Sequence, residues 1–189
     1  MAMDAGERPL PRWAEVGSVV VAGVAIVLGI VLRLAPEDEP FDTVRFVFLL
    51  VGLAVSLTAS VTYLVAVIRG KLRVAMIPNA RSRPRRDVRR LSRAAVGPLQ
   101  VSDHEGPIVR VAARRLVDQS ALQVTAFVGF TVLSASNLAQ VSGDRDDWRW
   151  VFAASSAMFL GFLVMTLWQY HGALRVLARS EPAPADEVR

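Results

Sequence analysis

Residues 46–68, FVFLLVGLAVSLTASVTYLVAVI, decide the fold, because they contain no Asp, Glu, Lys or Arg over 23 positions. At about 1.5 Å per residue, a helix of this length crosses the roughly 30 Å hydrocarbon layer of a bilayer. The same four residue types are absent from 16–32, 119–143 and 150–174. These runs show no period-two alternation, so they are not strands of a membrane barrel. The sequence therefore predicts an all-α, polytopic membrane protein with four transmembrane helices and excludes a soluble globular domain.

Charge is concentrated between these runs, although hydrophobic residues make up 53% of the chain and charged residues 21%. The absence of cysteine excludes a disulfide scaffold, a thiolate metal site and a Cys nucleophile. Lys71 is the only lysine beside 21 arginines, a bias typical of a GC-rich genome, and we expect a bacterial source.

The first apolar run could instead be a cleaved signal peptide. Such a peptide begins with a basic segment, whereas Asp4 and Glu7 accompany Arg8 and Arg12 here, and no small-x-small cleavage site follows the run. We therefore expect a retained span.

The distribution of Lys and Arg predicts the orientation. The segment before the first run holds two of them, 69–118 holds thirteen, the segment after the fourth run holds three, and the two short loops hold four. The positive-inside rule then places both termini in the cytoplasm. We expect a cytoplasmic N-tail (1–15), a transmembrane hairpin (16–68), a basic cytoplasmic loop (69–118), a second hairpin (119–174) and a cytoplasmic C-tail (175–189), which makes a multi-pass protein of the bacterial plasma membrane.

Prolines at 78, 84, 98 and 107 interrupt the basic loop, so one continuous helix is not expected there. The sequence instead predicts a short helix over 85–95 and a second helix that opens at Pro107 and runs into the third span.

The short helix lies in an arginine cluster whose position next to an anionic leaflet predicts contact with lipid headgroups. A protein partner is the alternative, and nucleic acid is not expected because 69–118 contains no aromatic residue for stacking. Ser92, in Arg89-Arg90-Leu91-Ser92, is a possible phosphorylation site that would weaken lipid contact; the alternative is an unmodified serine. The predicted lipid contacts are Arg81, Arg83, Arg85, Arg86, Arg89, Arg90 and Arg93.

Small residues recur at every fourth position in three spans, and in lipid such ridges allow close helix packing. Packing within the chain and docking of another protein both remain open. The ridges are Gly52, Ser56 and Ser60; Ala121, Thr125 and Gly129; and Ala153, Ala157 and Gly161. A further polar set could either line a hydrated cavity or form hydrogen bonds between helices: Thr131, Ser134, Ser136, Asn137, Ser56 and Thr58.

Candidate catalytic groups are sparse. Glu15 at the beginning of the first span and His171 near the end of the fourth are each typical of residues that reach the membrane interface. Asp103, His104 and Glu105 are consecutive, so their side chains diverge and do not suit one metal ion. We expect no enzymatic activity, no cofactor and no metal. The sequence favours an accessory or interaction subunit of a membrane assembly, with partner proteins or self-association; the alternative is an oligomeric channel or transporter for a small solute.

Overall fold

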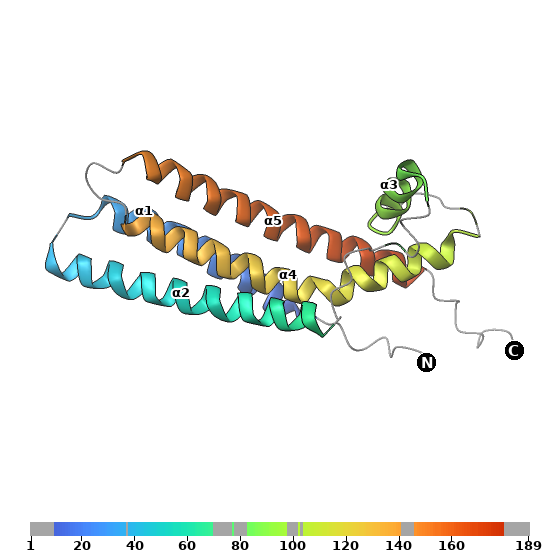
Figure 1. Cartoon of the computed structure of the whole chain (residues 1–189), viewed down its shortest axis with the longest axis horizontal. Coiled ribbons are helices and arrows are strands. Elements are labelled where there is room, and N and C mark those ends of the chain that lie inside the picture. The colour runs from blue at the N-terminus through green and yellow to red at the C-terminus, as the bar shows by residue number, and fades with distance from the viewer. Residues whose placement is uncertain are drawn as a thin grey trace, which may run out of the picture.

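The computed structural model describes residues 10–36, 38–69, 77, 83–97, 102, 104–140 and 146–179, with the backbone alone for 146 and 147. These residues form five helices and no strand (Figure 1). The helices are α1 (Arg12–Leu34), α2 (Glu39–Ile68), α3 (Arg85–Ala94), α4 (Gly106–Gln140) and α5 (Asp146–Arg179).

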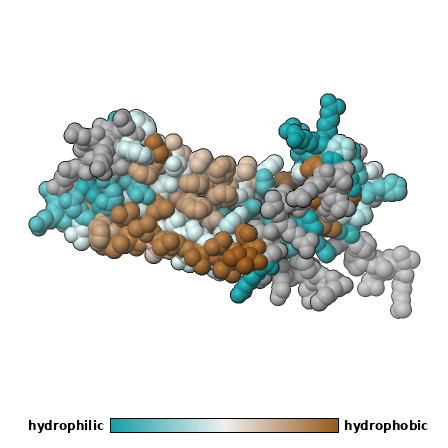
Figure 2. Space-filling model, viewed as in Figure 1, coloured by the Kyte–Doolittle hydropathy of each residue, from teal (hydrophilic) through white to brown (hydrophobic). Residues whose placement is uncertain are grey.

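Four of these helices, α1, α2, α4 and α5, are long and apolar enough to cross a membrane by length and composition. Large hydrophobic side chains are exposed along α1, α2 and α5, including Val24, Leu57 and Val164. Figure 2 shows a hydrophobic band between hydrophilic ends. Such a band is costly in water but suits a lipid environment. The predicted all-helical fold is confirmed for the described residues, with four helices long and apolar enough to span a membrane.

Prolines set several helix boundaries. Pro36 follows α1, and the preceding Ala35 has left the helix with a ψ of 151°, because a residue before proline disfavours the helical region. Pro40 lies in the first turn of α2 and Pro107 in the first turn of α4, where a missing N–H costs little. The predicted short helix at 85–95 and the helix opening near Pro107 are confirmed as α3 and the start of α4.

α4 is the central helix. α1, α2 and α5 all pack on it, whereas α1 and α2 follow one another in the chain yet touch each other little. Half of the apolar window of α4 is buried, compared with 17% for α5. Three of the long helices thus surround the fourth, α4, and the second connection, between α4 and α5, joins two helices in extensive contact.

Small residues permit this close approach to α4. A Cβ at Gly29 of α1 would lie 2.5 Å from the Ala135 carbonyl oxygen, and one at Gly129 of α4 would lie 2.9 Å from Ala59 Cβ on α2. A Cβ at Gly52 would collide with Ser136 Oγ. Side chains larger than hydrogen would therefore push α1 and α2 away from α4, as expected where packing rather than water exclusion holds membrane helices together.

The bundle has two ends. The loop end is where α1 and α4 finish and α2 and α5 begin; the α3 end is the opposite one, where α3 packs beside α4 (Figure 1).

Candidate functional site

At the α3 end, α3 presents a basic surface that is fixed to the rest of the protein. Leu91, Ala94 and the following Ala95 are buried in one hydrophobic cluster with residues of α4 and α5, including Leu116 and Tyr170. The arginines on the remaining faces of α3 stay exposed. We call this surface the basic platform, and it comprises Arg85, Arg86, Arg89 and Arg93.

Two contacts set the position of the platform. Gly172 of α5 lies directly beneath the Val96 carbonyl oxygen, and a Cβ at this position would overlap that oxygen. Arg90 forms an ion pair with Glu105, which lies just before α4. Because α3 is held on both sides, its exposed arginines are presented as one surface rather than on a free loop.

The predicted lipid-contact residues therefore divide into groups. The four platform arginines are exposed, Arg83 is half-buried, and Arg90 is exposed but paired with Glu105. Arg81 lies outside the described residues.

Ser92, the possible phosphorylation site, is half-buried within α3, and its Oγ donates a hydrogen bond of 2.7 Å to the Val88 carbonyl. Its position in the last turn of α3 is one where a phosphate would oppose the helix dipole. Phosphorylation there would loosen α3 itself, in addition to reducing its positive charge.

Glu15 and His171, which the sequence treats as two separate interfacial residues, lie next to each other. His171 Nε2 on α5 is 3.0 Å from Glu15 Oε2 on α1. Glu15 is 8% exposed, and its other oxygen, Oε1, is buried without a hydrogen-bond partner among the described residues. The neighbouring Tyr170, 1% exposed, donates its hydroxyl to the Leu10 carbonyl at 3.4 Å. These contacts fasten the start of α1 to the end of α5.

A sequence signal for this pair existed. Glu15 lies near the start of the first span and His171 near the end of the fourth, and in a four-span protein these two positions share one membrane face. The sequence could not show that α1 and α5 turn these particular side chains toward each other.

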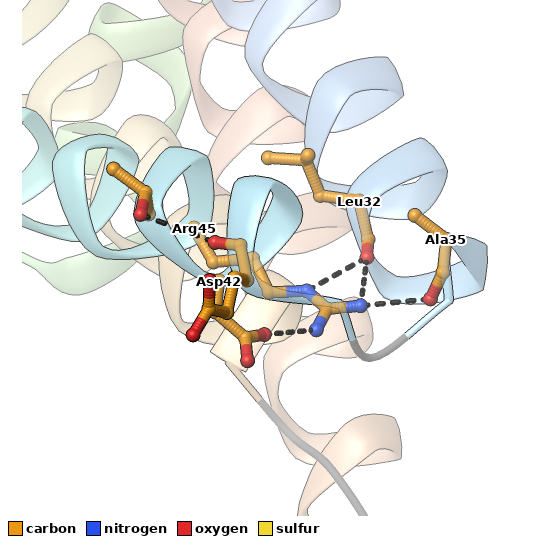
Figure 3. A network of polar contacts seen from close by, with 6 residues as sticks. Leu32, Ala35, Asp42 and Arg45 are labelled. Atoms are coloured by element: carbon orange, nitrogen blue, oxygen red, sulfur yellow. Dashed lines mark hydrogen bonds and ion pairs between the residues drawn. The ribbon is translucent and has the colours of Figure 1, made fainter.

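The sequence did not predict the contacts of Arg45, because this residue counts there only as one of the charges of a short loop. It is 6% exposed, and its guanidinium reaches back from α2 to the end of α1 (Figure 3). Nε and Nη2 donate to the Leu32 carbonyl at 3.0 and 2.8 Å, Nη2 donates to the Ala35 carbonyl at 2.8 Å, and Nη1 contacts Asp42 Oδ1 at 2.7 Å. Arg45 thus caps the carbonyl end of α1, where intrahelical donors run out.

The three small-residue ridges differ in how far they are buried. On α2, Gly52 and Ser56 are buried against α4 and Ser60 is half-buried. On α4, Gly129 is buried against α2, Ala121 is half-buried and Thr125 is exposed.

The α5 ridge faces outward instead. Ala153 is half-buried, whereas Ala157 and Gly161 are exposed, and a Cβ at Gly161 would meet no atom within 4 Å. Internal packing therefore explains the α2 ridge and part of the α4 ridge but not the α5 ridge.

Polar residues in the spans mostly bond to their own helix. Thr131 donates to the Phe127 carbonyl, and Ser136 and Asn137 donate to the Leu133 carbonyl. The remaining polar residues are Ser134 and Ser56, which are buried, and Thr58, which is exposed. Within the described part of the chain, no group of three His, Asp or Glu side chains could hold a metal ion.

Comparison with known proteins returns no match to a protein family, a curated protein or a solved structure.

Proposed function

We propose that this chain is a non-enzymatic integral membrane protein of the bacterial plasma membrane and acts as an accessory or interaction subunit of a membrane assembly. Both termini and 69–118 lie on the cytoplasmic side in this proposal, because these segments hold most of the basic residues. The main support for this proposal is the basic platform. Its four exposed arginines are fixed in place at the end of the bundle that would face anionic headgroups.

The outward α5 ridge supports a protein partner. Ala157 and Gly161 are exposed on the least buried of the long helices, and a helix from another protein could approach this backbone closely. Self-association through the same ridge is the other form of this proposal.

The channel or transporter alternative has less support. Thr131, Ser136 and Asn137, which would have to line a hydrated path, already donate hydrogen bonds to carbonyls of α4. Ion conduction by the protein in reconstituted vesicles would favour the channel or transporter over the accessory subunit.

Native mass spectrometry in mild detergent tests the platform. We expect the wild type to retain anionic phosphatidylglycerol in preference to phosphatidylcholine with the same acyl chains. An Arg86→Gln/Arg89→Gln variant should lose much of this preference, whereas an Arg12→Gln/Arg69→Gln variant, which removes two exposed arginines elsewhere at the α3 end, should keep it. Equal losses in both variants would mean that the platform is not a specific surface.

Co-purification tests the partner. We expect a second chain, or a second copy of this one, at a fixed stoichiometry in the wild type and its loss in Ala157→Leu. Ala54→Leu is the matched control, since Ala54 is exposed on α2. A protein that remains a single chain in both forms would contradict the accessory-subunit proposal.

Reporter fusions test the orientation. Fusions at Ala94 and after residue 189 should report cytoplasm and a fusion at Glu39 should report the outside; an external signal from Ala94 would overturn the topology.

A further inference from the structure

A groove at the loop end opens between α1 and α5, with α4 as its floor. Its volume is about 270 Å³, and its apolar walls include Ile30 of α1, Leu138 of α4 and Ala153 of α5. This is slightly below the roughly 300 Å³ at which small-molecule pockets begin, so it suits part of a ligand whose remainder lies outside. The groove lies at the opposite end of the molecule from the basic platform (Figure 1).

Two arginines line the mouth of the groove. Arg33, in the last turn of α1, and Arg149, in the first turns of α5, both line it and are half-buried. Trp150 lines the same mouth, is 69% exposed, and its ring centroid lies 5.3 Å from the Arg149 guanidinium carbon. Arginine and tryptophan at the ends of apolar helices belong to the headgroup layer of a bilayer.

Both arginines also interact within the chain. A guanidinium has five N–H donors in a planar fork and binds phosphate in a bidentate manner. A guanidinium that already has one partner thus retains further N–H donors for a phosphate.

We propose that the groove is a binding site for an anionic phospholipid from the leaflet at the loop end. Its phosphate diester lies between Arg33 and Arg149, and one acyl chain packs along Ile30, Leu138 and Ala153 while the second stays in the bilayer. Two arginines at the mouth and apolar walls below it favour this occupant over a partner helix, which would have to bury two guanidinium groups. The proposed site requires that the four long helices span a membrane. It requires neither lipid binding at the basic platform nor a protein partner.

Native mass spectrometry of the full chain tests the site, with phosphatidylglycerol as the probe and phosphatidylcholine of the same acyl chains as the comparison. We expect wild-type protein to bind one phosphatidylglycerol at this site and the Arg33→Gln/Arg149→Gln variant to bind it about tenfold or more weakly, as removal of charged hydrogen-bond donors implies. Ala153→Trp, which fills the groove and leaves both charges, should lose the same lipid. The platform variant Arg86→Gln/Arg89→Gln should lose only the phosphatidylglycerol bound at the platform and keep the one in the groove, so that failure here and failure of the platform are distinguishable.

A second readout is local. In a protein with Trp13, Trp148 and Trp168 changed to Phe, bromine on the acyl chain of phosphatidylglycerol should quench Trp150 at a lower lipid fraction than brominated phosphatidylcholine does. Equal quenching by both lipids, retention unchanged by Ala153→Trp, or a co-purified protein in the groove would each overturn the proposal. Thermal unfolding of each variant separates loss of lipid from loss of fold.

Discussion

Replacing Arg45 with alanine should weaken the protein more than replacing any exposed arginine, because Arg45 completes the end of α1. The Ala35 N–H already bonds to the Val31 carbonyl at 3.0 Å. The next carbonyl, that of Leu32, receives both Nε and Nη2 of Arg45, and Leu32 itself is 3% exposed. Removal of the guanidinium leaves this buried carbonyl without those donors and releases α2 from α1, which otherwise touch little.

The size of the effect follows from the groups left without partners. A buried polar group that loses its hydrogen bond costs about 1–3 kcal/mol, and loss of the half-buried Ala35 contact adds about 1 kcal/mol. The ion pair with Asp42 adds little, about 0.5 kcal/mol, because the Asp42 side chain is 62% exposed. The free energy of unfolding should therefore fall by about 2.5–4.5 kcal/mol, which for a chain of this size lowers the midpoint temperature by about 5–18 °C.

Thermal unfolding in a mild detergent, followed by circular dichroism, measures this shift. Arg69→Ala is the control, since Arg69 is exposed at the other end of the same helix, and should move the midpoint by less than about 2 °C. Arg45→Lys should recover part of the loss, because an ammonium keeps the charge but lacks the planar fork that reaches both carbonyls. Asp42→Ala should resemble Arg69→Ala. If Arg45→Ala unfolds at the same temperature as Arg69→Ala, then Arg45 does not cap α1 and the reasoning is wrong.

Three further predictions concern packing and the α3 end. Gly129→Leu should lower the free energy of unfolding by about 1–3 kcal/mol, because its Cβ would press on Ala59, whereas Gly161→Leu should be tolerated in the isolated chain. If thermal unfolding shows Gly161→Leu to be the more destabilising change, α4 is not the central helix. Glu15→Gln should lower the free energy of unfolding by about 1 kcal/mol. A double-mutant cycle with His171→Ala should show coupling, since both changes remove the same contact at 3.0 Å. Additive losses would mean that the pair contributes nothing to stability. Leu91→Asp should release α3 from the bundle and raise tryptic cleavage at its arginines about tenfold or more, because a charge cannot stay in a fully buried site. The control Ser102→Asp, at an exposed position, should not raise cleavage. Equal cleavage rates in the two variants would show that α3 is not docked.

The class of the protein and several helix boundaries were predictable from local sequence. Pro84 and Pro107 marked the starts of α3 and α4, and the uncharged runs marked the four long helices, because each signal acts within a few residues of the chain. The observed helices extend beyond those runs, as α4 does from Gly106, since a helix can continue into polar surroundings when no residue breaks it. The α3 arginines were also predictable from the sequence, whereas the separate pairing of Arg90 with Glu105 was not.

The contacts between helices were not predictable in the same way. In α1, α2 and α5 the exposed face and the face toward the rest of the protein are both apolar, so hydrophobic periodicity does not reveal which face packs inward. The α5 ridge has the same spacing as the α2 ridge, yet Gly161 is exposed where Gly52 is buried.

The sequence by itself determined that the chain is helical, that four helices suit a membrane, and that positive charge gathers between the second and third of them. A bilayer imposes length and polarity on each segment separately, so these properties can be read one segment at a time. Only the tertiary structure decided that α4 is central, that Arg45 caps α1 from the neighbouring helix, and that Glu15 meets His171. Those outcomes depend on the rotation and depth of one helix against another, which small residues allow but do not specify when viewed along a single helix.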